Sequence, residues 1–128
     1  MSLFPIFLKL AARPCTVIGA GHLAESKIES LQAANAQITV IAPEASERIL
    51  NLAAAGEIQY HQRPYVSGDL AGSFLVVAAT NVPSVNRAVF QEATEKVVLF
   101  NAVDDPPFCD FYFPSVVRRG DLQIAISS

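Results

Sequence analysis

The stretch CTVIGAGHLA, Cys15 to Ala24, decides the fold. A short apolar run ends at Gly19, and Gly21 and Ala24 complete a G-x-G-x-x-A pattern. Gly19 allows a tight turn, Gly21 lets the backbone approach a pyrophosphate, and Ala24 keeps the next helix close to the sheet. The free N–H groups at the start of that helix favour a phosphate. The alternative is a plain strand-to-helix turn that needs small residues.

Strands and helices alternate along most of the chain. The patterns predict extended runs at 4–8, 15–18, 37–42, 58–61, 74–79 and 97–103, and helices at 22–34, from Pro43 to Ala55, and from Pro83 onward. The apolar stripes that we expect to face the core are Ala24, Ile28, Leu31 and Ala34 on the first helix, and Val85, Ala88, Val89 and Ala93 on the third. The unbroken apolar run 74–79 is typical of a central parallel strand. This order predicts an α/β fold of Rossmann type, an open parallel sheet with helices on both faces.

The last segment breaks the alternation. Phe111–Phe113 is predicted to be extended, Arg119–Asp121 to be a turn, and Leu122–Ile126 to be a strand, which together make a C-terminal β extension. An apolar terminal strand leaves an open edge, which pairing across a two-fold axis would close. We therefore expect a homodimer formed through the C-terminal third.

Composition excludes several classes of protein. The chain has 128 residues, of which 52% are hydrophobic and only 16% charged, which also favours self-association. Its net charge of −3 argues against a nucleic-acid partner. No apolar run approaches the roughly 20 residues of a membrane span, and we expect neither a signal peptide nor a membrane partner. Cys15 and Cys109 lack metal-type spacing, so we expect no metal site and a reduced, cytoplasmic protein.

Ligands of open α/β sheets bind at the carboxyl ends of the strands. That rule places Gly19–Leu23, Pro43-Glu44, Thr80-Asn81 and Asn101–Asp104 around one crevice. The second strand lacks the acidic residue that usually binds the adenine ribose, because the nearest acid, Glu44, comes slightly late. Arg48 lies a helical turn further on, so the residues alone leave both NAD and NADP open.

Motifs along nearly the whole chain resemble one family. They are FPIFLKL at the start, VIGAGHLAESK, ITVIAPE, the AATN…VN pair (78–81 and 85–86), NAVDD, FYFPSVV and the closing LQIAISS. In this order and spacing the chain resembles the N-terminal module of siroheme synthase and its stand-alone relatives, the precorrin-2 dehydrogenases and sirohydrochlorin ferrochelatases. Ordinary dehydrogenases lack an N-x-V-D element followed by F-x-F-P-S.

The resemblance implies oxidation of the tetrapyrrole precorrin-2 to sirohydrochlorin with NAD, in siroheme biosynthesis, and in some members insertion of ferrous iron. It implies that Asp104 is the catalytic residue, and the alternative is that Asp104 and Asp105 shape the turn before Pro106. It also divides the chain into an NAD-binding domain, 1–113, and the start of a dimerisation region, 114–128, without the family's helical C-terminal domain. The residues expected at the cofactor are Gly19, Gly21, His22, Leu23, Ala24, Pro43, Glu44, Thr80, Asn81 and Asn101.

Some alternatives stay open at this stage. A small Rossmann module can also serve as a nucleotide sensor that oxidises nothing, although such sensors typically carry the ribose acid and do not need NAVDD or FYFPS. His22 is more typical of a helix-start residue than of a catalyst. Arg118 and Arg119 could receive substrate carboxylates or form the exposed tip of a hairpin.

Overall fold

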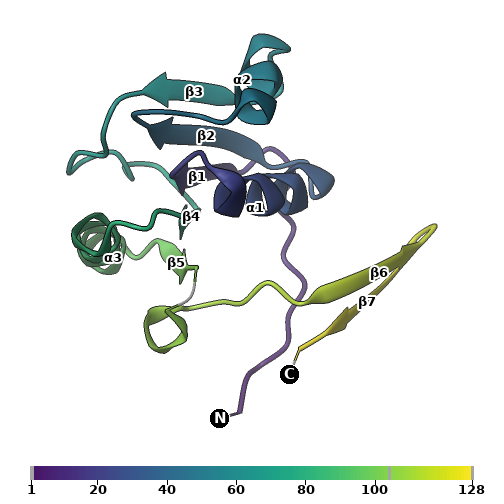
Figure 1. The fold of residues 1–128 in the computed structure, drawn as a ribbon. Coiled ribbons are helices and arrows are strands. Elements are labelled where there is room, and N and C mark those ends of the chain that lie inside the picture. The colour runs from purple at the N-terminus through teal and green to yellow at the C-terminus, as the bar shows by residue number, and fades with distance from the viewer. Residues whose placement is uncertain (1, 104, 128) are drawn as a thin grey trace.

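A five-stranded parallel sheet in the order β3-β2-β1-β4-β5 forms the centre of the molecule (Figure 1). Its strands are β1 (Pro14–Ile18), β2 (Gln37–Ala42), β3 (Gln59–Gln62), β4 (Leu75–Ala78) and β5 (Leu99–Ala102). The computed structural model describes residues 2–103 and 105–127, so Asp104 lies outside the described residues. The direction of strand order reverses between β1 and β4, and this switch point is where ligands of such sheets bind.

Helices cover both faces of the sheet, which confirms the predicted fold class. Helices α1 (His22–Ala33) and α2 (Glu47–Ala54) pack on one face, where Val17, Val40 and Val77 are fully buried. Helix α3 (Pro83–Lys96) packs on the other face, against Val76 and Phe100. Because adjacent strand residues point to opposite faces, each central strand supplies both layers of the core.

Several local predictions were wrong in detail. Helix α2 begins at Glu47 rather than Pro43, because the Ser46 hydroxyl accepts a hydrogen bond from the Ile49 N–H at 3.4 Å and caps the helix there. Strand β3 lies one residue later than expected. Ala88 is exposed, since the buried stripe of α3 consists of Val89, Glu92 and Ala93.

The C-terminal segment forms an antiparallel hairpin apart from the main sheet. After a short 3₁₀ helix, η1 (Pro106–Phe108), strands β6 (Ser115–Arg119) and β7 (Leu122–Ile126) pair with each other and project outward (Figure 1). This confirms the β extension, although the stretch 111–113 precedes the strand and is not itself part of one. Every residue of both strands is exposed. Among the described residues, no helix combines the length and the apolar character that a membrane span needs.

Candidate functional site

A cleft of about 550 Å³ opens at the carboxyl edge of the sheet. It is lined by three of the expected segments, the glycine-rich turn 19–23, Pro43-Glu44 after β2, and Thr80-Asn81 after β4. The structure therefore brings together segments that lie far apart in the sequence. The lining also includes residues outside these segments, among them Pro64, Tyr65, Val82 and Val85.

The two glycines of the turn meet different constraints. Gly19 has a φ of +113°, a backbone conformation that residues with a Cβ rarely adopt. Its N–H donates a hydrogen bond to the Ile41 carbonyl at 3.0 Å. Gly21 precedes α1 with a φ of −99°, and a Cβ there would find no atom within 4 Å. Gly21 thus keeps space open at the cleft beside the start of α1, where the first N–H groups of a helix are available to a phosphate.

The remaining residues of the turn divide between surface and core. The His22 side chain is 96% exposed and lies 3.4 Å from the Glu25 carboxylate, as a helix-start residue would. Leu23 is exposed at the cleft, whereas Ala24 is fully buried and packs in the core. Ala24 therefore acts on the cleft indirectly, by holding α1 against the sheet.

Thr80 and Asn86 shape the loop on the opposite side of the cleft. The Thr80 hydroxyl accepts from the Val82 N–H at 3.1 Å, and the Asn86 amide donates to the Thr80 carbonyl at 3.0 Å. These bonds order the turn before α3 and leave Asn81 exposed at the cleft. The two asparagines of the AATN…VN pair therefore differ in their surroundings, because Asn86 orders the turn and Asn81 is exposed.

Asn101 does not line the cleft. It is buried in β5, and its amide donates to the Phe111 carbonyl at 2.9 Å. Phe100, which precedes Asn101 in β5, donates its N–H to the Asp110 carboxylate at 3.0 Å. The side chain of Asn101 therefore ties the NAVDD element to the FYFPS element, which gives this pair of motifs a structural reason to occur together.

The surroundings of the two cysteines indicate a structural role for both. Cys15 is buried in β1, and burial raises the pKa of its thiol to about 11. Burial also raises the pKa of Cys109, whose sulfur lies 3.3 Å from the Ala102 nitrogen beside β5. Both thiols are therefore protonated and poorly nucleophilic at neutral pH. Within 2–103 and 105–127, His, Cys, Asp and Glu form no cluster of three or more that could hold a metal ion.

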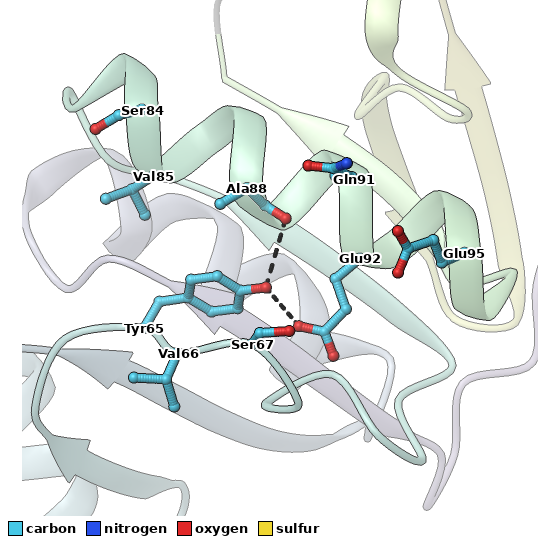
Figure 2. Close-up of a pocket in the computed structure, with 9 residues that line it drawn as sticks. All are labelled: Tyr65, Val66, Ser67, Ser84, Val85, Ala88, Gln91, Glu92 and Glu95. Carbon is cyan, nitrogen blue, oxygen red and sulfur yellow. Dashed lines mark hydrogen bonds between the residues drawn. The ribbon is translucent and has the colours of Figure 1, made fainter.

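A second cavity, of about 510 Å³, lies next to the cleft (Figure 2). Tyr65 and Val85 line both spaces. The other residues that line the second cavity are mixed, with the apolar Val66 and Ala88 beside the polar Ser67, Ser84, Gln91, Glu92 and Glu95. The Tyr65 hydroxyl points to the Glu92 carboxylate on α3 and donates a hydrogen bond to it. Sequence reasoning missed this pair because a glutamate in a helix and a tyrosine in a turn-rich loop carry no local signal of contact.

The comparisons with known proteins agree with this geometry. Residues 6–115 match a family model described as "Putative NAD(P)-binding". The whole chain is 41% identical to a siroheme synthase of Methylobacillus flagellatus and to siroheme synthase 1 of Pectobacterium atrosepticum, but it spans only 27% of the length of each. The solved structure of SirC, precorrin-2 dehydrogenase, covers 98% of the chain with a TM-score of 0.86 at 30% identity, and the chain covers 61% of that structure. The resemblance drawn from the motifs is confirmed.

Proposed function

Because the chain belongs to the NAD(P)-binding family of the siroheme synthases and precorrin-2 dehydrogenases, we propose that it binds NAD and acts in the dehydrogenation of precorrin-2 to sirohydrochlorin. The observation that carries the proposal is the cleft at the switch point of the sheet, bordered by the Gly19–Leu23 turn and the start of α1. A dinucleotide needs this combination of a close backbone approach and free N–H donors for its pyrophosphate.

The reaction removes a hydride and a proton from the tetrapyrrole. NAD, when bound, supplies the hydride acceptor. The proton needs a base, and we assign this role to Asp104. The assignment is supported by its place in the chain, directly after Val103, whose N–H donates to the Ala78 carbonyl at 3.1 Å where β5 ends.

The surroundings of Glu44 favour NAD over NADP. Glu44 lines the cleft after β2, where the fold normally binds the adenine ribose. Its carboxylate would repel the extra phosphate of NADP. Arg48, the nearest cation on α2, instead lies 3.3 Å from Glu29 and 3.9 Å from Glu25 on α1. The arginine is thus engaged between the two helices rather than at the ribose position.

We further propose that 1–113 is the cofactor-binding domain and that 114–128 begins a dimerisation region. Paired residues of β6 and β7 share a face of the hairpin, so Val117, Leu122, Ile124 and Ile126 gather on one side. These four side chains are 46% to 61% exposed. A second copy of the chain would bury this apolar face. A sensor that only binds the nucleotide is not favoured, because the relatives are biosynthetic enzymes.

Incubation of the protein with precorrin-2 and NAD tests the activity. We expect NADH and sirohydrochlorin to appear in equal amounts, as followed by absorbance, and Gly21→Leu to lower the yield of both at limiting NAD. Binding of NAD with no oxidation of precorrin-2 would favour the sensor instead. Addition of ferrous iron to the same reaction tests whether the product is metallated, with iron as a substrate.

A further inference from the structure

Tyr65 forms a wall shared by two cavities. It lines the 550 Å³ cleft that holds the glycine-rich turn. It also lines the 510 Å³ cavity beside α3, which Figure 2 shows. Tyr65 belongs to the loop that leads from β3 to β4, and this loop carries no helix. A loop side chain can serve as a binding surface only if something holds it in place.

The hydroxyl of Tyr65 is held by α3. It donates to one oxygen of the Glu92 carboxylate, and it lies 3.5 Å from the Ala88 carbonyl. The other carboxylate oxygen accepts from the Leu70 N–H at 3.1 Å and from the Lys96 ammonium at 2.9 Å. Glu92 therefore binds both the ring and the backbone of the loop to the same helix.

Burial of Glu92 needs these partners. Glu92 is only 4% exposed, and an unpaired carboxylate in that position would lower the stability of the fold. Burial alone would raise the pKa of Glu92, but the hydrogen bonds from Tyr65, Lys96 and the backbone outweigh it and lower the pKa. Burial and the same hydrogen bond raise the pKa of Tyr65. At neutral pH the pair is thus a neutral phenol that donates to a carboxylate.

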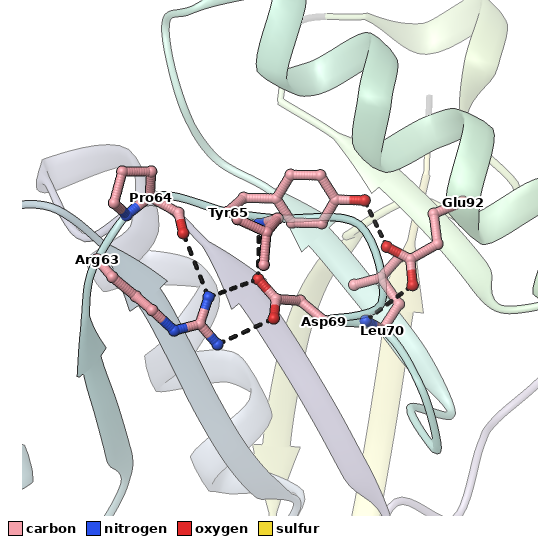
Figure 3. Close-up of polar contacts among 7 residues, drawn as sticks. Arg63, Pro64, Tyr65, Asp69, Leu70 and Glu92 are labelled. Carbon is pink, nitrogen blue, oxygen red and sulfur yellow. Dashed lines mark hydrogen bonds and ion pairs between the residues drawn. The ribbon is translucent and has the colours of Figure 1, made fainter.

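A second set of contacts, within the loop, also restricts it. The Arg63 guanidinium makes a two-pronged contact with Asp69, at 2.8 and 2.9 Å, and the same carboxylate accepts from the Val66 N–H at 2.8 Å (Figure 3). Two-pronged Arg–carboxylate contacts restrict geometry as well as adding energy. The Arg63–Asp69 contact spans Pro64 and Tyr65, and Glu92 holds Tyr65 itself, so the loop presents these two residues to the cleft in one arrangement.

The lining of the cleft has two kinds of surface. The backbone of the glycine-rich turn suits phosphates, whereas Pro43, Pro64, Tyr65, Val82 and Val85 are apolar. We propose that Tyr65 forms the stacking wall for the adenine base of the dinucleotide, and that Glu92 is the positioning residue that holds this wall in place. A purine is flat and has apolar faces, and stacking on an aromatic ring is a common way to bind one. The proposal rests on the proposed binding of NAD.

Measuring the binding of each half of the dinucleotide distinguishes the contribution of Tyr65 from that of the rest of the cleft. AMP carries the adenine, nicotinamide mononucleotide does not, and calorimetry measures both. We expect Tyr65→Ala to weaken AMP and NAD by about 10- to 100-fold, the range for loss of one base–aromatic stack, and to leave nicotinamide mononucleotide unchanged. Tyr65→Phe keeps the ring and should restore most of the affinity for AMP. A folded Tyr65→Ala protein that binds AMP within two-fold of the parent would overturn the proposal that Tyr65 stacks on the adenine.

The role of Glu92 is tested through Tyr65. Glu92→Gln should weaken AMP several-fold in the parent and clearly less in Tyr65→Phe, where the hydrogen bond from the hydroxyl is already absent and only the contacts of Glu92 with Leu70 and Lys96 remain. Glu95→Gln is the matched control, because Glu95 lines the same second cavity from the same helix. Equal effects of Glu92→Gln in both backgrounds would overturn the positioning role. Tyr65-dependent binding of AMP without oxidation of precorrin-2 would refute the proposed activity and leave the wall standing.

Discussion

Gly19 packs directly against the backbone of Ala79, so that a Cβ on Gly19 would lie 2.7 Å from the Ala79 carbonyl carbon. The two residues follow β1 and β4, the neighbouring strands on either side of the switch point. Ala79 is also bonded to β1, through its N–H and the Ile18 carbonyl at 2.8 Å. The first glycine of the motif therefore serves the close approach of two loops, while Gly21 faces open space at the cleft.

Within this one motif, we therefore expect Gly19 to matter mainly for stability and Gly21 mainly for binding of NAD. Gly21→Leu should fold like the parent and lose NAD affinity by at least about tenfold, because its side chain would occupy the space needed by the pyrophosphate. Gly19→Ala should lower the free energy of unfolding by roughly 1–3 kcal/mol, the usual range for a strained backbone position. Urea unfolding and calorimetric titration with NAD measure the two effects. Unchanged NAD affinity in folded Gly21→Leu would contradict the assignment.

Much of the fold could be predicted because its signals are local. An apolar run such as 74–79 is readable as a buried strand, and the Gly19-Gly21 turn is readable as the join between strand and helix. The crevice followed from the rule on carboxyl ends, and it correctly united three segments. That rule says which strand end a residue is near but not where its side chain points. Asn101 accordingly was expected at the crevice and instead binds Phe111.

Contacts made by loops could not be predicted in this way. The start of α2 depended on a cap at Ser46 that competed with Pro43, a residue equally suited to a first turn. Glutamate is a residue type that usually faces solvent in a helix. The burial of Glu92 is favourable only because the loop around Tyr65 supplies hydrogen-bond donors. Long-range polar pairing leaves no periodicity in the sequence from which it could be inferred.

Asp104→Ala tests the proposed base. Loss of a general base typically lowers the rate by about 10²–10⁴-fold, so we expect oxidation of precorrin-2 to slow by this factor while NAD binds as in the parent. Asp105→Ala, at the adjacent exposed position, is the control and should retain activity within a few-fold. If Asp104→Ala turned over at a rate near that of the parent, the aspartate would be a turn residue.

Glu44→Lys tests the choice of cofactor. Removal of the carboxylate and addition of an ammonium should improve NADP affinity by roughly tenfold or more relative to NAD, because a like charge at the 2′-phosphate is replaced by an opposite one. Glu47→Lys makes the same change of charge nearby, at an exposed position that does not line the cleft. Competition between the two cofactors, measured by calorimetry, gives the ratio. An equal shift in both variants would mean that Glu44 exerts only a general charge effect.

Acid should weaken the loop that carries Tyr65. The hydrogen bonds from Arg63 lower the pKa of Asp69 below its ordinary 3.8. A lowered folded-state pKa means that the ionised form stabilises the fold, fully above pH 3.8 and progressively less as the pH falls through the folded value. Asp69→Asn should therefore be less stable than the parent at pH 7, and the difference in unfolding free energy should shrink at pH 2–3. Asp121→Asn, in the hairpin turn, is the control, and a pH-independent difference for Asp69→Asn would contradict the argument.

The hairpin supplies the last prediction, on self-association. Ile124 lies on the apolar face of β7 opposite Val117, and both side chains are about half exposed, at 46% and 51%. Burial of that face against a second copy would bring apolar surface out of water, whereas a carboxylate placed there would lose its hydration without a partner. Ile124→Glu should therefore weaken the dimer by at least about tenfold. Gln123→Glu, one residue away on the opposite face and paired with Arg118, should leave it intact. Light scattering across a concentration series measures both variants, and a parent protein that stays monomeric at high micromolar concentration would mean that the apolar face of the hairpin is not a dimer interface.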